Sequence, residues 1–251
     1  MTDTAQRAPM CAISIENLTK RYGDVLAVDG LSLSVYEGEL FSLLGVNGAG
    51  KSTTIKMLSG LVTPTSGDAH LLGKSISREM TEAKRTLAVS PQETAVAPML
   101  SVRENLELMC GAHGFSKEKR NEKCEELISL LGLADVAKRR AGKLSGGYQR
   151  RLSIAMALIS EPKILFLDEP TLGLDVLARS DLWDLIRSLK GKVTIVLTTH
   201  YMEEAEALSD RIAIMRDGRL LVCDTAAAIK EMTGADRFEE AFIRIVKGAE
   251  K

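Results

Sequence analysis

Hydrophobic and polar residues alternate in two early segments of the chain, as they do in strands with one buried face. The first segment contains Ile13 and Ile15, and the second contains Leu31, Leu33 and Val35. Later runs are continuously apolar, a pattern typical of strands covered on both faces in a parallel sheet. These runs are Leu40–Leu44, Thr86–Val89, Ile164–Leu167 and Thr194–Leu197. We therefore expect an α/β fold built around a mainly parallel sheet with some antiparallel strands.

The stretch from about 93 to 160 has a different pattern, with few strand signals and apolar residues at helical spacing. Ser101 and Glu104 have the spacing of a capping box before an apolar run. Gly132 follows a second apolar stripe as a natural helix stop. The residues of that stripe are Cys124, Leu127, Ile128 and Leu131. We interpret the stretch as a helical lobe inserted into the α/β part.

The two ends of the chain have simpler patterns. Residues 1–10 lack any periodicity and are expected to form a disordered tail. Ile212–Met215 and Leu220–Val222 flank Asp217-Gly218, a dipeptide typical of tight hairpin turns. Residues from about 225 to 248 have the pattern of one or two short helices.

Composition narrows the class of protein. The chain has 251 residues, of which 33 are basic and 34 acidic, so the formal charge is −1. This balance argues against a dedicated nucleic-acid binder, which usually carries a basic excess. The four cysteines are scattered without a CxxC pair, which favours reduced thiols in a cytoplasmic protein over a disulfide framework or zinc site.

Apolar runs are too short for a membrane span, which needs roughly 20 residues. The N-terminus also lacks the apolar core of a signal peptide. We therefore expect the chain alone to be soluble and to reach a membrane only through a partner.

A glycine-rich segment, Gly45–Ser52, reads GVNGAGKS and matches the pattern GxxxxGK[ST]. It follows an apolar strand and precedes a helix expected from Lys51 to Leu58, the context that phosphate binding requires. Its backbone N–H groups and the helix N-terminus would point at phosphate oxygens. Lys51 would reach the β- and γ-phosphates, and the Ser52 hydroxyl would ligate Mg²⁺.

Two carboxylates, Asp168 and Glu169, end the apolar run that begins at Ile164. The tip of a buried strand is an unfavourable place for two acids unless a cation or a reacting group lies there. Asp168 suits a direct or indirect contact with Mg²⁺. Glu169 suits the base that polarises an attacking water.

A second glycine-bearing helix start, Leu144–Arg151, reads LSGGYQRR. A serine cap followed by two glycines can form another anion site. Spacing alone, however, favours an ordinary capped helix.

Together these segments resemble the nucleotide-binding subunit of ATP-binding cassette (ABC) transporters. The resemblance rests on GVNGAGKST, LSGG, LFLDEP and GLD, with a Gln after one strand and a lone His after TIVLTT. It extends from about Ile13 to Cys223. It implies that two subunits stack head to tail, so that each ATP lies between the phosphate loop of one and the LSGG segment of the other. Ser145 and Gly147, with Gly146 between them, would then contact ATP held by the partner.

The resemblance also implies roles for single residues. Tyr22 would stack on adenine, although the residues alone leave an ordinary core or surface aromatic open. Gln92 would contact Mg²⁺ or the attacking water and sense the membrane partner. Asp175 would lie at the dimer seam. His200 would bind the γ-phosphate and orient Glu169 and its water.

These expectations define three sets of residues. The catalytic set is Lys51, Gln92, Glu169 and His200. The Mg²⁺ set is Ser52, Gln92 and Asp168. The nucleotide-binding set is Tyr22, Asn47, Gly48, Ala49, Gly50, Lys51, Ser52, Thr53, Ser145, Gly146, Gly147 and Asp175.

The domain organisation implied by the resemblance is one nucleotide-binding domain over 1–251. Residues 11–91 and 161–223 would form the ATP-binding core, 92–160 the helical subdomain with the signature segment LSGG (Leu144–Gly147), and 224–251 the C-terminal helices. The helical subdomain would carry a groove for a coupling helix of an integral-membrane permease. The subunit would work as a homodimer, or as one of a pair of cassettes, at the cytoplasmic face of the membrane.

Several segments look like the export group of the family, which includes drug-resistance, antibiotic-efflux and ABC-2 type systems. An importer subunit is the nearest alternative within transport. A soluble ABC ATPase acting on ribosomes or DNA is another, although the chain has one cassette and no long heptad run. A P-loop kinase would leave LSGG and GLD without a role.

Overall fold

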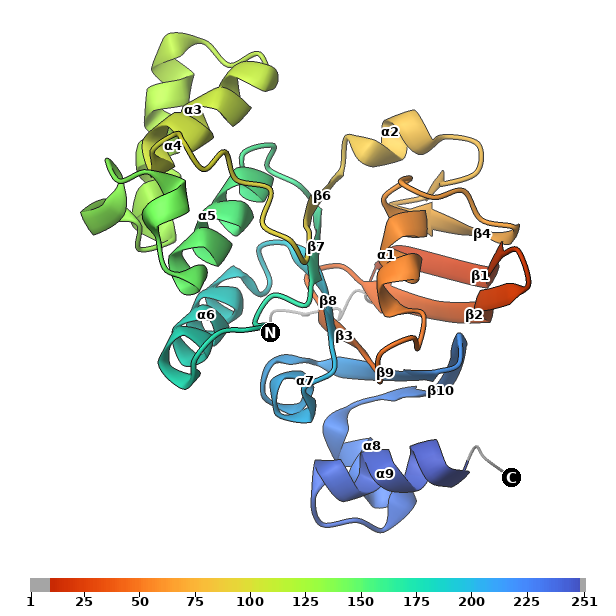
Figure 1. Cartoon of the computed structure of the whole chain (residues 1–251). Helices are drawn as coiled ribbons and strands as arrows, with labels where there is room; N and C mark the ends of the chain where they lie inside the picture. Colours follow the sequence, from red (N-terminus) through yellow and green to blue (C-terminus); the bar gives the residue numbers. More distant parts are fainter. Residues whose placement is uncertain (1–9, 249–251) are drawn as a thin grey trace, which may run out of the picture.

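The computed structural model describes residues 10–248. Residues 1–9 of the tail expected at 1–10, and residues 249–251 at the C-terminus, lie outside the described residues. The rest of the chain is arranged around a central sheet, with an antiparallel sheet on one side and helices on the other (Figure 1).

The central sheet has six strands. They are β3 (Leu40–Leu44), β6 (Leu87–Ser90), β7 (Ile164–Asp168), β8 (Thr194–Thr199), β9 (Arg211–Arg216) and β10 (Arg219–Asp224). The order is β10-β9-β3-β8-β7-β6, and every neighbouring pair is parallel except the β9–β10 hairpin. This confirms the mainly parallel sheet, and only β6 starts one residue later than the apolar pattern predicts.

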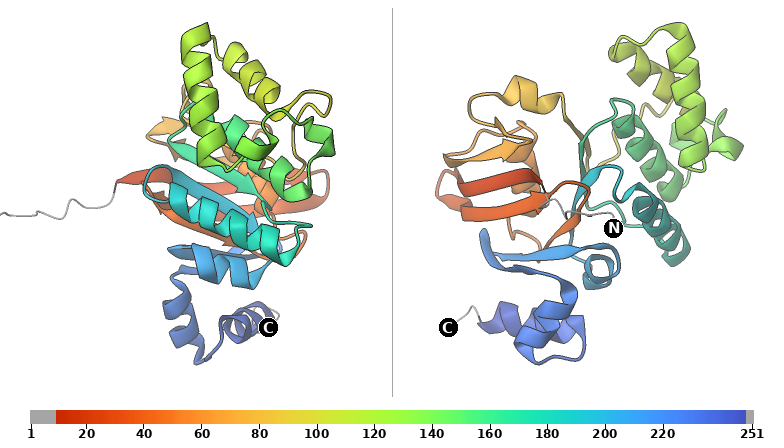
Figure 2. Two further views of the ribbon diagram at one scale, coloured as in Figure 1. Left: turned by 90° about the vertical axis from the view of Figure 1, so that its left-hand side faces the viewer. Right: turned by 180° about the vertical axis from the view of Figure 1, so that it is seen from behind.

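The smaller sheet is antiparallel in each pair that the register defines. Its strands are β1 (Cys11–Tyr22), β2 (Val25–Tyr36), β4 (Ser66–Leu71) and β5 (Lys74–Ser75), in the order β2-β1-β4-β5. Helix α1 (Lys51–Leu58) lies between the two sheets (Figures 1 and 2). The short helix α2 (Met80–Lys84) leads from this sheet toward β6.

The central strands are buried on both faces because their side chains alternate between two cores. On β7, Leu165 and Leu167 join the core beneath the helices, whereas Ile164 and Phe166 join the core around α1. The continuous apolar pattern of the sequence has its physical cause in this double covering.

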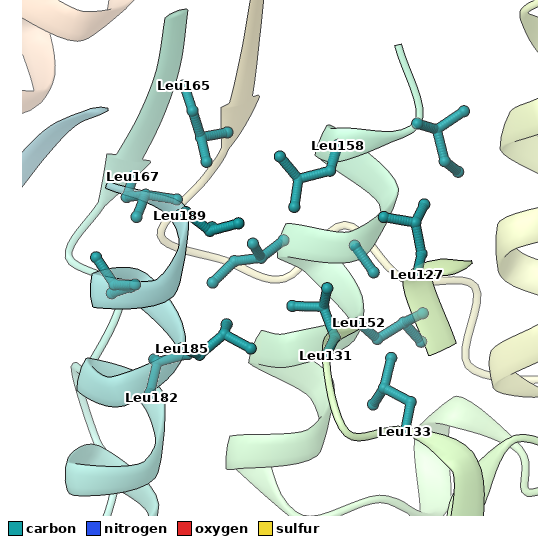
Figure 3. Close-up of a cluster of buried hydrophobic side chains, with 14 of the residues drawn as sticks. Leu127, Leu131, Leu133, Leu152, Leu158, Leu165, Leu167, Leu182, Leu185 and Leu189 are labelled. Atoms are coloured by element: carbon teal, nitrogen blue, oxygen red, sulfur yellow. The ribbon is translucent and has the colours of Figure 1, made fainter. Parts of the chain in front are cut away.

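Helices cover the other face of the central sheet. They are α3 (Val102–Ala112), α4 (Lys117–Leu130), α5 (Gly146–Leu158) and α6 (Val176–Leu189), with 3₁₀ turns η1 (Ala134–Val136) and η2 (Ala141–Lys143). Leucines from α4, α5, α6 and β7 meet in one core, shown in Figure 3. The predicted capping box is present, since Ser101 accepts from the Glu104 N–H and Glu104 accepts from the Ser101 N–H.

The chain ends in helices below the central sheet (Figure 2). They are α8 (Ala226–Thr233) and α9 (Phe238–Gly248), and α7 (Met202–Leu208), which connects β8 to β9, lies near them. Phe238 and Phe242 of α9 share a small core with Ile212 and Ile214 of β9. The hairpin turn at Asp217-Gly218 has φ values of 50° and 79°, as the sequence led us to expect.

Candidate functional site

The segment Gly45–Ser52 curls tightly between β3 and α1. Gly50 has φ +99°, and a Cβ added there would lie 2.6 Å from the carbonyl oxygen of Ala27. A side chain at this position would therefore collide with backbone, which explains the glycine. The first turn of α1 contains no acidic residue, so its free N–H groups form an anion-binding helix start.

Lys51 is folded back into this loop and is only 5% exposed. Its Nζ donates to the carbonyl oxygens of Gly45 at 2.8 Å and Val46 at 3.3 Å, and lies 3.4 Å from Glu169 Oε1. The ammonium is thus aimed at the centre of the loop. Phosphate oxygens arriving there would find a cation already desolvated and in place.

Ser52 and Asp168 approach each other across the same loop. The Ser52 hydroxyl donates to Asp168 Oδ1 at 2.9 Å, and the Thr198 hydroxyl donates to the same oxygen. A hydroxyl and a carboxylate side by side are hard oxygen ligands of the kind that Mg²⁺ prefers, with phosphate oxygens and water completing its shell. The residues therefore fit the expected ion.

Glu169 has an unusual backbone conformation directly after β7. Its φ is +48°, which is rare for a residue other than glycine and is common at functional sites. Its N–H donates to the Thr198 hydroxyl at 3.0 Å, which fixes the turn. The carboxylate is 6% exposed and lies between Lys51 and His200, whose Nδ1 is 2.6 Å from Oε2. The end of β7 thus directs the Glu169 carboxylate toward the loop, where Lys51 and His200 contact it from two sides.

One cleft of about 730 Å³ joins most of the predicted site. It brings together these residues of the three predicted sets: Tyr22, Asn47, Gly48, Ala49, Gly50, Lys51, Ser52, Thr53, Gln92, Glu169 and His200. Asp168 does not line the cleft itself but accepts a hydrogen bond from the Ser52 hydroxyl, which does. Ser145, Gly146, Gly147 and Asp175 do not line this cleft, so within one subunit they are separate from the phosphate loop.

The cleft also contains residues that the sequence analysis missed. They are Val25, Leu26, Ala27, Leu172 and Asp217. Asp217 is there because the β9–β10 turn packs on the loop, with the Gly218 N–H donating to Ala49 O at 3.2 Å. Val25 pairs with Tyr22 across the β1–β2 turn. The turn at Tyr22-Gly23 could have indicated that Val25, just after it, lies beside Tyr22 in the cleft. Nothing near Asp217 in the sequence indicates that its turn packs against the phosphate loop.

Tyr22 lies at the end of β1 and is 45% exposed. Lys20 Nζ is 4.9 Å from the centre of its ring. An exposed ring at the mouth of the cleft has the position that stacking on a base requires. Its role remains a prediction.

The start of α5 differs from the expected serine cap. Ser145 occupies the N-cap position, but its side chain accepts no hydrogen bond from the helix. Ser101 and Ser116, at the starts of α3 and α4, do accept such bonds. Ser145 is exposed, so its hydroxyl and the first N–H groups of α5 remain available to an outside anion.

Asp175 caps α6, since its Oδ1 accepts from the Ala178 N–H at 2.9 Å. Directly after it, Val176 and Leu177 are 78% and 77% exposed. This exposed apolar pair at the helix start suits a contact surface better than free solvent. The predicted place of Asp175 at a dimer seam is otherwise untested.

Glu204 of α7 is a buried carboxyl close to the cleft and is 0% exposed. Trp183 Nε1 donates to its Oε1 at 3.1 Å. Burial raises the pKa of Glu204, the negative charge of Glu169 adds to the rise, and hydrogen bonds led by Thr199 offset part of it. The sequence gives no sign that Glu204 is buried, because a Glu on a helix is usually exposed.

The fold and the cleft together define a P-loop nucleotide-binding protein. Residues 28–172 match the family described as ABC transporter. The chain is 44% identical over 230 residues to phospholipid-transporting ATPase ABCA3 from Homo sapiens, covering 90% of this chain and 14% of ABCA3. It is 41% identical over 229 residues to daunorubicin resistance ATP-binding protein DrrA3 from Streptomyces coeruleorubidus, covering 91% of this chain and 72% of DrrA3.

A solved structure is also similar. It is an ATP-binding cassette in a dimeric, post-hydrolysis state bound to ADP and Pi, with a TM-score of 0.75 and 28% identity. The match covers 85% of this chain and 98% of that chain. The chain therefore belongs to the ABC transporter family, and its fold is that of the ATP-binding cassette. Between residues 10 and 248, none of the helices is both long and apolar enough to span a membrane.

Proposed function

We propose that the chain is the ATP-hydrolysing subunit of an exporter whose membrane-spanning part is a separate permease. The observation that carries the proposal is the carboxylate of Glu169, held between Lys51 and His200 at the edge of the phosphate loop. Relatives named for phospholipid transport and for daunorubicin resistance support export of a lipid, drug, antibiotic or similar compound.

Each residue of the cleft has its own role in ATP hydrolysis. Lys51 and the loop N–H groups bind the β- and γ-phosphates, and Tyr22 stacks on the adenine. Glu169 accepts the proton of the attacking water, while His200 orients Glu169 and the γ-phosphate. Ser52, Asp168 and Gln92 would hold Mg²⁺, which would supply positive charge to neutralise the phosphates. Positioning and charge stabilisation carry the reaction, so no covalent intermediate with the protein is required.

The second half of each ATP site comes from a partner cassette in this proposal. Ser145, Gly146 and Gly147 do not line the cleft of their own chain, and their helix start is open. A second copy stacked head to tail would place this start on the γ-phosphate in the first copy, with Asp175 at the seam. The related cassette solved as a dimer supports this arrangement.

The permease would dock on the helical side of the molecule. A cleft of about 450 Å³ lies between the helices and the edge strand β6, and its lining includes Leu61, Val89, Met109 and Met156. We assign 92–160 to a helical subdomain that receives a coupling helix there, 11–91 and 161–223 to the ATP-binding core, and 224–251 to a C-terminal segment. The subunit would then be peripheral, at the cytoplasmic face of the membrane.

Affinity purification of the tagged chain from detergent-solubilised membranes, followed by identification of co-purifying proteins, tests this proposal. We expect an integral-membrane permease and an ATPase activity that depends on Mg²⁺. Recovery with a permease that works with an extracytoplasmic binding protein would indicate an importer. Recovery only with ribosomes or DNA, without membrane fraction, would contradict a transport role.

A further inference from the structure

Arg150 of α5 is buried against the loop that carries Gln92. It is 5% exposed, and its Nη1 donates to Pro91 O and its Nη2 to Gln92 O, each at 2.6 Å. A second buried contact lies one turn further along, where the hydroxyls of Ser153 and Ser90 are 2.9 Å apart. The helix that begins at the signature segment is therefore attached to the end of β6 at two points.

The two residues whose carbonyls Arg150 binds line different clefts. Pro91 lines the cleft between the helices and β6, while Gln92 lines the nucleotide cleft. Ser145, at the start of the same helix, is exposed and faces neither of these two clefts. One guanidinium thus joins the segment where the two clefts meet to the helix that presents the signature residues.

The chemistry of this contact requires an arginine. Two parallel N–H donors of a planar guanidinium match two successive carbonyl oxygens, whereas a lysine offers one flexible point charge. Desolvation lowers the pKa of Arg150, and the negative charges of Asp168 and Glu204 counteract that effect. Arginine stays charged even so, and a buried charge held by two carbonyls is costly to displace.

We propose that Arg150 is a positioning residue that makes the Gln92 loop and the signature helix move as one body. It does not touch nucleotide itself. It keeps Gln92 placed for Mg²⁺ and the attacking water of its own subunit, and at the same time sets the angle at which Ser145 meets the ATP of the partner. This inference rests on the proposed dimeric ATPase function.

The test uses Arg150→Lys as the main variant, because it keeps the positive charge and removes only the pair of parallel N–H donors. Arg150→Gln is a second variant. Arg151→Gln is the matched control, since Arg151 is the next residue of α5 and pairs with the exposed Asp181 instead of the Gln92 loop. Two readouts follow the two ends of the link: the Mg²⁺ concentration that half-saturates ATP hydrolysis, and the ATP-dependent dimerisation of each variant combined with Glu169→Gln.

We expect Arg150→Lys to raise the half-saturating Mg²⁺ concentration about fivefold and to weaken dimerisation by a similar factor, a coupling of ordinary size. Mg²⁺-free ATP binding and the Arg151→Gln control should change less than about twofold. A purely structural role would lower the melting temperature and leave both readouts unchanged in the folded fraction. That result, or a change in one readout only, would overturn the inference.

Failure of the proposed ATPase function would give a different result from failure of the proposed role of Arg150. If the unmutated chain neither hydrolyses ATP nor dimerises as Glu169→Gln, the underlying function is wrong. If the unmutated chain does both and the Arg150 variants match it, only the role of Arg150 is wrong.

Discussion

The two glycine-bearing helix starts differ in how far their own chain satisfies them. In the phosphate loop, the Lys51 ammonium already contacts two carbonyls and Glu169. At the signature segment, Ser145 is exposed and its hydroxyl bonds to no helix N–H. Both starts have the positive end of a helix dipole. The first start holds the Lys51 ammonium inside its loop, whereas the second presents the exposed Ser145 at its surface.

The glycines of the two segments also have different surroundings. Gly50 is enclosed by backbone, with Ala27 O 2.6 Å from an added Cβ. At Gly147 the nearest atom is the Ala178 side chain of α6, 3.1 Å away. The first glycine allows a tight loop, whereas the second allows α6 to approach α5. The signature glycines therefore have a packing role within the chain as well as a proposed role toward a partner.

Glu169→Gln should have the largest effect on the closed site, by which we mean the phosphate loop with Lys51, Glu169 and His200 around it. The variant keeps the shape of the side chain but cannot accept a proton, so ATP hydrolysis should fall about a hundredfold or more. ATP binding should persist, and an ATP-bound dimer should accumulate on size-exclusion chromatography with MgATP. Glu203→Gln, an exposed neighbour of His200 with the same charge change, is the control. Hydrolysis at the unmutated rate would remove Glu169 from the role of base.

Lys51→Ala should act on the same site through binding. Charge-assisted hydrogen bonds contribute about 1.5–3 kcal/mol, so ATP affinity should fall roughly tenfold or more. Lys56→Ala is the control, because Lys56 lies on the same helix α1 but is exposed. A filter-binding assay measures the affinity. Undiminished affinity, in a variant that melts as the unmutated protein does, would contradict the closed description of the phosphate loop.

Local pattern was enough to predict the phosphate loop and the strands around it. Leu40–Leu44 and Ile164–Leu167 read as buried strands because both faces are covered, and GxxxxGK[ST] is a local pattern that by itself predicts the loop between strand and helix. The position of His200 after β8 followed from the same kind of reading. Local pattern therefore predicts which segments supply the site, although not the contacts between them.

Contacts between distant segments could not be predicted in this way. Thr198 holds both Asp168 and the Glu169 N–H, yet in sequence it is one polar residue at the end of an apolar strand. Arg150 binds carbonyls 58 and 59 residues away. The serine of LSGG was expected to cap its helix, and the structure leaves it free. Such features depend on which elements become neighbours, which periodicity does not encode.

Ser145→Ala and Ser101→Ala should separate an open helix start from a capped one. Ser101 accepts a hydrogen bond from the Glu104 N–H, so Ser101→Ala should lower the free energy of unfolding by about 1 kcal/mol. Its ATPase activity per folded molecule should stay unchanged. Ser145→Ala should show the reverse, with unchanged stability and weaker ATP-dependent dimerisation and hydrolysis. Urea unfolding and ATPase assays measure the two effects. Equal stability losses in both variants would mean that Ser145 is an ordinary cap.

Glu204→Gln should give the smallest effect and locate a pH dependence beneath the closed site. The folded-state pKa of Glu204 lies above its ordinary value of 4.5 because the carboxyl is buried. Its contribution to stability is therefore complete below the unfolded-state pKa and is lost as pH rises through the folded-state pKa. Glutamine does not titrate, so the free energy of unfolding of Glu204→Gln should improve relative to the unmutated protein on going from pH 5 to pH 8. Urea unfolding at both pH values measures the difference, and the fluorescence of Trp183, the single tryptophan of the chain, reports on the hydrogen bond to this carboxyl.

Glu203→Gln, exposed on the same helix, should show no such change with pH. A constant difference between Glu204→Gln and the unmutated protein at both pH values would mean that Glu204 stays in one protonation state throughout.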